Sequence, residues 1–151
     1  MQLEVVAPEL LKFQVSDGVA GNGLEEVHSK FPIDMSNPAA VDPEDLAILK
    51  AARKTAENAE TKAGGFNEAI KAAGGKNTTQ GRALQIGKIK NKVLKLQLQV
   101  TTLIIEGAQG KDTAAKLAEE KAKLEKNVKL DREAAGQRSQ SVDFQGTSQP
   151  Q

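Results

Sequence analysis

The longest run of apolar positions lies between residues 84 and 105, where apolar side chains recur at alternating spacings of three and four. The positions that share this spacing are Ile86, Ile89, Val93, Leu96, Val100 and Leu103. Such a period keeps side chains on one face of an α-helix. The run therefore predicts a long helix from about residue 80 to residue 107, capped by Thr78 or Thr79.

A second periodic segment follows Gly107 and Gly110 and predicts another long helix at about 112–135. Its apolar face carries Leu117, Leu124 and Val128. Two pairs of opposite charge, four residues apart, support it: Glu119 with Lys123 and Glu125 with Lys129. Because the connection between the two helices is short, we expect an antiparallel hairpin.

Residues 94–100 also fit a different structure, because apolar and polar side chains alternate there as in a half-buried strand. Leu, Lys and Gln are good helix formers, however, and the helical face continues upstream through Ile86 and Ile89. The length of the periodic segment therefore favours a helix over a strand.

The strongest start signal upstream is Asp42, which can cap a helix that has Pro43 at its first position and Glu44 and Asp45 in its first turn. We expect this helix at about 43–62. Short helices are expected at 66–73 and at 24–31, the latter with Asn22 as its cap.

These elements predict an all-α fold, in which the long hairpin packs with the helix at 43–62 and with the short N-terminal helices. We expect residues 1–18 to form an extended or partly helical arm and residues 19–136 to form a single helical domain. Residues 137–151 are expected to be a flexible tail unless Val142 and Phe144, its only apolar side chains, dock elsewhere.

The amino-acid composition limits the number of domains, the kind of core and the metal chemistry that the chain can have. The 151 residues are enough for one domain, and the aromatic content of 3% means that the core is mainly aliphatic. Without cysteine there is no disulfide and no cysteine-ligated metal.

We expect no membrane span, because no apolar run is long enough. The first twelve residues lack the apolar run of a signal peptide, so a secreted form would be a mature one without that peptide.

Charge is unevenly distributed along the chain. Residues 1–60 carry 11 acidic and 5 basic side chains, whereas residues 76–105 carry six basic side chains and no acidic one. A basic helix docked on an acidic N-terminal half would explain this distribution without a partner.

The basic segment also offers the one candidate binding surface, a possible anion-binding face that consists of Arg82, Lys88, Lys92 and Lys95. Lysines on one helical face can contact phosphates. Aromatic residues that would stack on bases are absent from the segment, which disfavours nucleic acid as the partner. A solvated or internally paired face is the simpler interpretation.

Other candidate residues have simple structural explanations. His28 is the only histidine and has no catalytic partner in the sequence beyond the nearby Glu25. The acidic group around Asp42 fits helix capping better than a calcium loop, because Pro43 and the lack of a loop Gly break that pattern. We therefore predict no catalytic residue, no metal site and no cofactor. Asn77 begins an N-glycosylation triplet in a polar, Gly-rich loop.

Three strings carry a family resemblance: Val15 to Asn22, Lys90 to Leu96, and Ser141 to Thr147. Through them the chain resembles cysteine-free small secreted proteins of filamentous fungi, whose functions are mostly uncharacterised. The resemblance implies an extracellular or cell-wall protein, such as a host-interaction factor, and transfers no catalytic residue.

Together these observations predict a non-enzymatic, secreted interaction or cell-surface protein with an unknown protein or cell-wall partner. The alternative is an intracellular, cytoplasmic protein that binds nucleic acid or an anionic surface through the basic face around residues 82–95. The sequence does not predict the oligomeric state.

Overall fold

The computed structural model describes residues 13–144 and confirms an all-α fold. Its helices are α2 (Gly23–Lys30), α3 (Pro43–Thr61), α4 (Phe66–Ala72), α5 (Thr79–Ala108) and α6 (Ala114–Glu133), with a short 3-10 helix, η1, at Pro38–Ala40. Two short strands, β1 (Gly18–Val19) and β2 (Arg138–Ser139), form one antiparallel pair.

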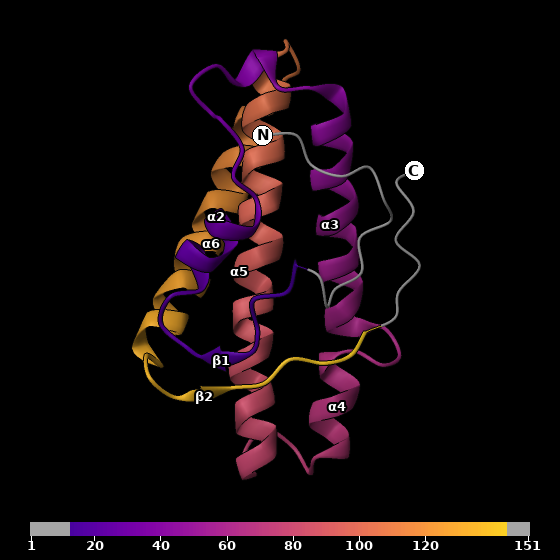
Figure 1. Cartoon of the computed structure of the whole chain (residues 1–151), viewed down its shortest axis with the longest axis vertical. Helices are drawn as coiled ribbons and strands as arrows, with labels where there is room; N and C mark the ends of the chain where they lie inside the picture. The colour runs from indigo at the N-terminus through magenta and orange to yellow at the C-terminus, as the bar shows by residue number, and fades with distance from the viewer. Residues whose placement is uncertain (1–12, 145–151) are drawn as a thin grey trace.

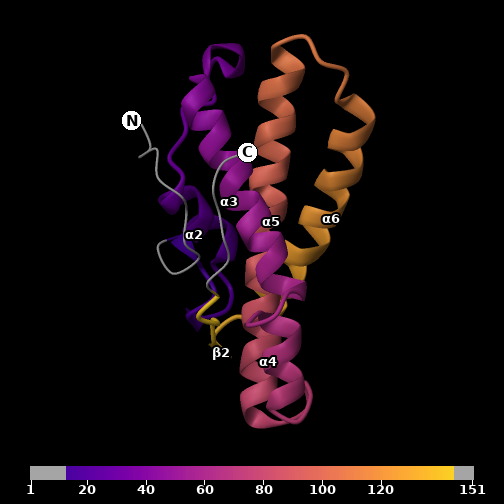
Figure 2. The same cartoon turned by 90° about the vertical axis from the view of Figure 1, so that its right-hand side faces the viewer.

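Helix α5 is the centre of the molecule. It runs along the long axis with α3 on one side and α6 on the other, as two perpendicular views show (Figures 1 and 2). Helix α4 packs against α5 near the N-terminal end of α5, and α2 and β2 also pack on it. The predicted antiparallel hairpin of α5 and α6 is therefore present, and α5 is covered from several directions.

This central position explains the alternating pattern at residues 94–100, which is helical as predicted. Leu94, Leu96, Leu98 and Val100 are all buried, whereas the polar residues between them are half-buried. A helix with a single buried face would not bury positions two residues apart. In α5, neighbouring elements cover several faces, so apolar positions two residues apart are both buried.

The helix starts follow the predicted chemistry at two of three places. Asp42 Oδ1 accepts a hydrogen bond from the backbone N–H of Glu44 at 2.8 Å, and Thr78 Oγ1 accepts one from Gly81 N–H at 2.9 Å. Asn22 occupies the N-cap position of α2, but its side chain makes no capping bond. The Asp131 carboxylate of α6 accepts from the Gly23 N–H instead, at 2.8 Å.

The expectation of a flexible tail is wrong for residues 137–144. β2 pairs with β1, and Ser139, Val142 and Phe144 are buried. The apolar residues dock on the helices because they complete the core. The rest of the expected tail, residues 145–151, lies outside the described residues. Residues 1–12 of the expected arm also lie outside the described residues. In the rest of the arm, Phe13 and Val15 are buried.

Two distant segments meet at one turn of α5. The Ser16 hydroxyl donates to the Gly87 carbonyl at 2.7 Å, and the Gln140 N–H donates to the Ala83 carbonyl at 3.0 Å. The Ser139 hydroxyl in turn donates to the Ser16 carbonyl. This close approach requires a glycine, because a Cβ at position 87 would lie 2.0 Å from the Gln140 carbonyl oxygen.

We expect Gly87→Ala to destabilise the protein by roughly 1–3 kcal/mol, the usual cost of overpacking. This cost outweighs the gain of about 1 kcal/mol that alanine brings to a helix interior. Urea unfolding would measure it, and amide exchange at Gln140 should accelerate. Gly107→Ala is the control, because its Cβ would meet only the Thr113 hydroxyl, a side-chain atom that can move. Equal stability of the two variants would contradict the argument.

Candidate functional site

The basic residues of α5 lie on opposite sides of the helix. Lys88 and Lys92 are each two residues from Lys90, which is about 200° around an α-helix. Lys90 therefore points away from the face that carries Lys88, Lys92 and Lys95. Arg82 is the fourth residue of α5 and is exposed. The structure thus groups three of the four predicted residues and separates Arg82 from them by about one third of a turn.

Lys90 is the residue that the sequence pattern did not single out. Its side chain is completely buried. The ammonium group donates to the carbonyls of Asp17 (3.2 Å) and Val19 (2.8 Å) and pairs with Glu26 Oε1 at 2.9 Å. The sequence does contain a signal for this position: Lys90 is two residues from both Lys88 and Lys92, which places it on the opposite side of the helix. Lys90 therefore holds the N-terminal segment and α2 on α5.

The expected internal pairing of the basic helix is present in part. Glu26 and Glu60, both in the acidic first sixty residues, pair with Lys90 at 2.9 Å and with Lys95 at 3.7 Å. Lys88 and Lys92 are half-buried and form no ion pair within residues 13–144, and neither does the exposed Arg82. These three cations are the part of the predicted face that remains available for an external anion.

A groove between α3 and α6 continues this face of α5. We call it the charged groove; its volume is about 320 Å³, and it is lined by Arg53, Glu57, Lys95, Leu96, Gln99, Lys116, Glu120 and Lys123. Helix α5 supplies Lys95, Leu96 and Gln99. Lys92 and Lys88 extend the same helical face by one and two turns towards the start of α5.

Ion pairs hold the walls of the charged groove. Glu120 pairs with Lys116 at 3.0 Å and with Lys123 at 3.3 Å. Burial raises the pKa of Glu120, but the hydrogen bonds from the two lysines outweigh burial and leave its pKa below the usual value. Arg53 pairs with Glu57 at 3.0 Å on the α3 side. The carboxylate of Glu120 is thus kept charged between two cations.

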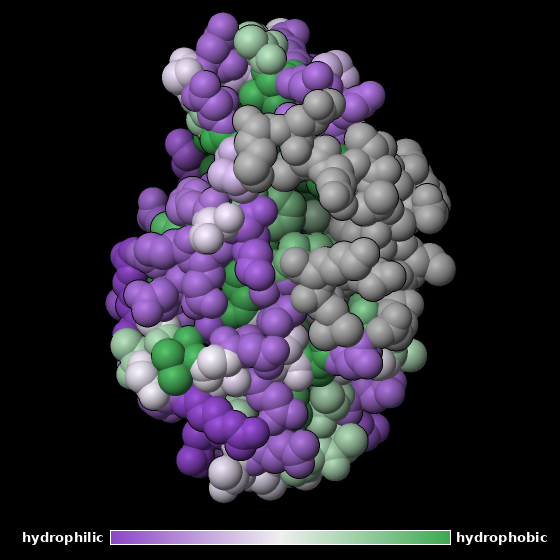
Figure 3. All heavy atoms as spheres, viewed as in Figure 1, coloured by the Kyte–Doolittle hydropathy of each residue, from purple (hydrophilic) through white to green (hydrophobic). Residues whose placement is uncertain are grey.

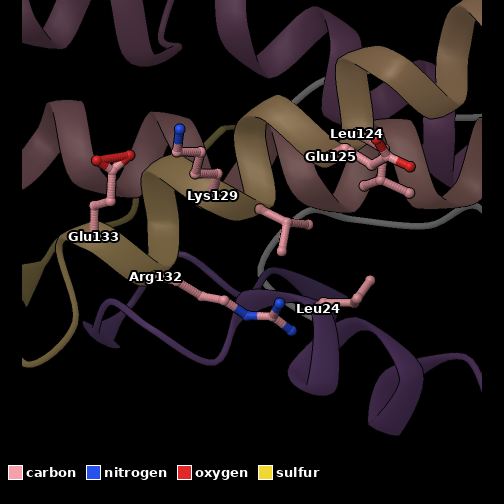
Figure 4. A pocket seen from close by; sticks show the side chains of 7 residues that line it. Leu24, Leu124, Glu125, Lys129, Arg132 and Glu133 are labelled. Atoms are coloured by element: carbon pink, nitrogen blue, oxygen red, sulfur yellow. The ribbon is translucent and has the colours of Figure 1, made fainter.

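A second concave site lies between α2 and α6 (Figure 4). This α2–α6 groove has a volume of about 600 Å³ and an apolar floor of Leu24, Leu124 and Val128. Its rim carries Glu125, Lys129, Arg132 and Glu133. Figure 4 shows Leu24 on α2 facing the side chains of α6, with Arg132 reaching towards α2.

One end of the α2–α6 groove is closed by contacts at the start of α2. The buried Asp131 carboxylate accepts hydrogen bonds from the N–H groups of Gly21 and Gly23, at 3.0 and 2.8 Å. Arg132 pairs with Glu25 at 3.3 Å. These contacts hold the start of α2 against the C-terminal part of α6, and the groove lies between the two helices next to them.

The rim of the α2–α6 groove is less paired than the sequence predicts. Glu119 and Lys123 form the expected ion pair at 3.5 Å. The second expected pair, Glu125 with Lys129, is not formed, and neither residue pairs elsewhere in the described part of the chain.

Figure 3 shows one face of the molecule, on which hydrophilic residues surround small, separate apolar patches.

The remaining candidates lie apart from both grooves. His28 is exposed on α2, and Asn77 is exposed in the loop between α4 and α5, as expected for a glycosylation triplet. Asp42 caps α3. Within residues 13–144, no group of His, Cys, Asp and Glu could hold a metal ion, and no helix there is long and apolar enough to cross a membrane.

Comparison with known proteins adds a family assignment. No curated protein and no solved structure matches the chain significantly. Residues 7–143, most of the chain, match the model of a family described as a domain of unknown function, DUF8454. The chain therefore belongs to the DUF8454 family.

Proposed function

We propose that the protein is a non-enzymatic, secreted interaction or cell-surface protein that binds a partner protein through the α2–α6 groove. The observation that carries this proposal is the apolar floor of Leu24, Leu124 and Val128 inside a charged rim. Protein-binding surfaces commonly combine an apolar centre, poor in charged residues, with a polar rim. A concave apolar site of this size can receive one or two large apolar side chains of a partner.

The rim supports a protein partner rather than a purely apolar small molecule. Glu125, Lys129 and Glu133 are exposed and form no ion pair within residues 13–144. They follow one another at intervals of four residues, so opposite charges alternate along one side of α6. A polypeptide with complementary charges would pair with them while its apolar side chains enter the groove.

Secretion and a role in host interaction rest on the resemblance to small secreted fungal proteins. Neither groove is lined by a His, Cys, Ser or Thr, which supports a binding role rather than nucleophilic catalysis. Immunodetection in the cells that make the protein would test its location. Full retention in the cytosol would contradict secretion, and turnover by the purified protein, abolished by one surface substitution, would contradict the non-enzymatic role.

Partner capture with matched variants tests the groove. Wild-type protein and the Leu24→Glu and Leu130→Glu variants would be cross-linked to proteins from the extracellular fluid and cell surface. Leu24 lines the groove, whereas Leu130 is 40% exposed on α6 and does not line it. We expect wild type and Leu130→Glu to capture the same partner and Leu24→Glu to lose it. A partner captured equally by all three proteins would contradict the proposed surface.

A further inference from the structure

We propose that the charged groove, together with Lys88 and Lys92, binds a linear polysaccharide that carries carboxylate groups. The proposal concerns a different surface from the α2–α6 groove and does not depend on it. The ligand class follows from the charge, the shape and the chemical composition of the groove.

The charge along this face of α5 favours an anion at its unpaired lysines. Four cations and two carboxylates line the charged groove, and Glu60 and Glu119 pair with two of those cations, so four carboxylates balance the four cations there. Lys92 and Lys88 lie on the same face of α5, one and two turns before Lys95, and add two cations that no carboxylate within residues 13–144 pairs with. Glu60 and Glu119 reduce the field at the edges, where they pair with Lys95 and Lys123. The least compensated part of this face is therefore at Lys88 and Lys92.

The shape of the groove favours a narrow chain. Its floor is one face of α5, and its walls are side chains of α3 and α6. Lys88, Lys92 and Lys95 are half-buried, so a flat membrane surface would reach the walls before it reached the floor. From Lys88 to Lys95 this face of α5 extends seven residues, or about 10 Å at 1.5 Å per residue. A single extended polymer chain can follow this line.

The composition of the groove favours a sugar acid over a nucleic acid. Single strands are usually held by aromatic residues that stack on bases. Phe13, Phe66 and Phe144 are buried in the core, and Phe31 packs edge-to-face on Phe13.

The groove also contains a group suited to sugar hydroxyls. The Gln99 side chain lines the groove and is half-buried, and its amide makes no hydrogen bond within residues 13–144. An amide can both donate to and accept from a hydroxyl. Lysines on the floor would then pair with the carboxylates while Gln99 contacts the hydroxyls between them.

A ten-residue oligogalacturonate is the probe for this proposal, with binding to the full chain measured by isothermal titration calorimetry. We expect saturable binding that weakens between about 50 and 200 mM salt. The double variant Lys88→Gln/Lys92→Gln should bind about tenfold more weakly, because it removes two charge contacts. Glu57→Gln should bind more tightly, since it frees Arg53 from its ion pair. Circular dichroism would confirm that each variant is folded.

Controls separate a specific site from a general effect of charge. Lys121→Gln/Lys126→Gln removes the same charge from exposed positions of α6 outside both grooves and should leave the affinity unchanged. The methyl-esterified oligomer, which has no charge, should not bind. The proposal is overturned if oligogalacturonate does not saturate the protein, if both double variants lose affinity equally, or if a deoxythymidine decamer or anionic vesicles bind more tightly than the oligomer.

Discussion

Leu94→Asp is expected to leave the chain unfolded. Leu94 is completely buried at the centre of α5 and belongs to the main apolar cluster. Loss of its packing alone would cost about 2–5 kcal/mol, and an unpaired carboxylate in that position adds several kcal/mol. The total approaches or exceeds the stability of a typical domain, about 5–15 kcal/mol. Loss of the helical circular dichroism signal at 25 °C would be the measurement.

The matched control is Leu130→Asp on α6. Leu130 is 40% exposed, so the new carboxylate stays in water, and the free energy of unfolding should change by no more than about 0.5 kcal/mol. A folded Leu94→Asp protein with native melting temperature would show that α5 is not the centre of the core. An unfolded Leu130→Asp protein would show that the outer face of α6 is buried by something else.

Lys90→Met is expected to lower the free energy of unfolding by about 3 kcal/mol, the lower end of the range for breaking a buried ion pair. Methionine keeps the length of the apolar stem but removes the donor that serves the carbonyls of Asp17 and Val19. Glu26 is 37% exposed and would be solvated again, which keeps the cost at the lower end. Urea unfolding would measure the loss, and amide exchange in α2 should become faster.

The same substitution at Lys92 provides the control. Lys92 is half-buried and forms no ion pair within the described residues, so Lys92→Met should change stability by about 0.5 kcal/mol at most. If the two variants were equally stable, the contacts of Lys90 would not hold the N-terminal segment. The comparison also distinguishes the structural lysine of α5 from the one proposed to bind ligand.

The candidate sites were only partly predictable. Helical spacing places Lys88, Lys92 and Lys95 on one face, and the structure keeps them there. The same spacing assigns Lys90 to the opposite face, but its burial depends on the carbonyls of Asp17 and Val19, and the sequence pattern does not show those contacts. The α2–α6 groove has no local signal, because its floor combines Leu24 with residues about one hundred positions later.

Local sequence signals predict the helices, their approximate ends and the hairpin of α5 and α6. These features depend on periodicity, capping at Asp42 and Thr78, and short connections, all of which are local. Three features depend on the folded chain as a whole: Val142 and Phe144 complete the core, the Asp131 carboxylate accepts from the first backbone N–H of α2, and two grooves flank α6. Those contacts join residues far apart in the chain, so they depend on how the helices pack and leave no periodic trace.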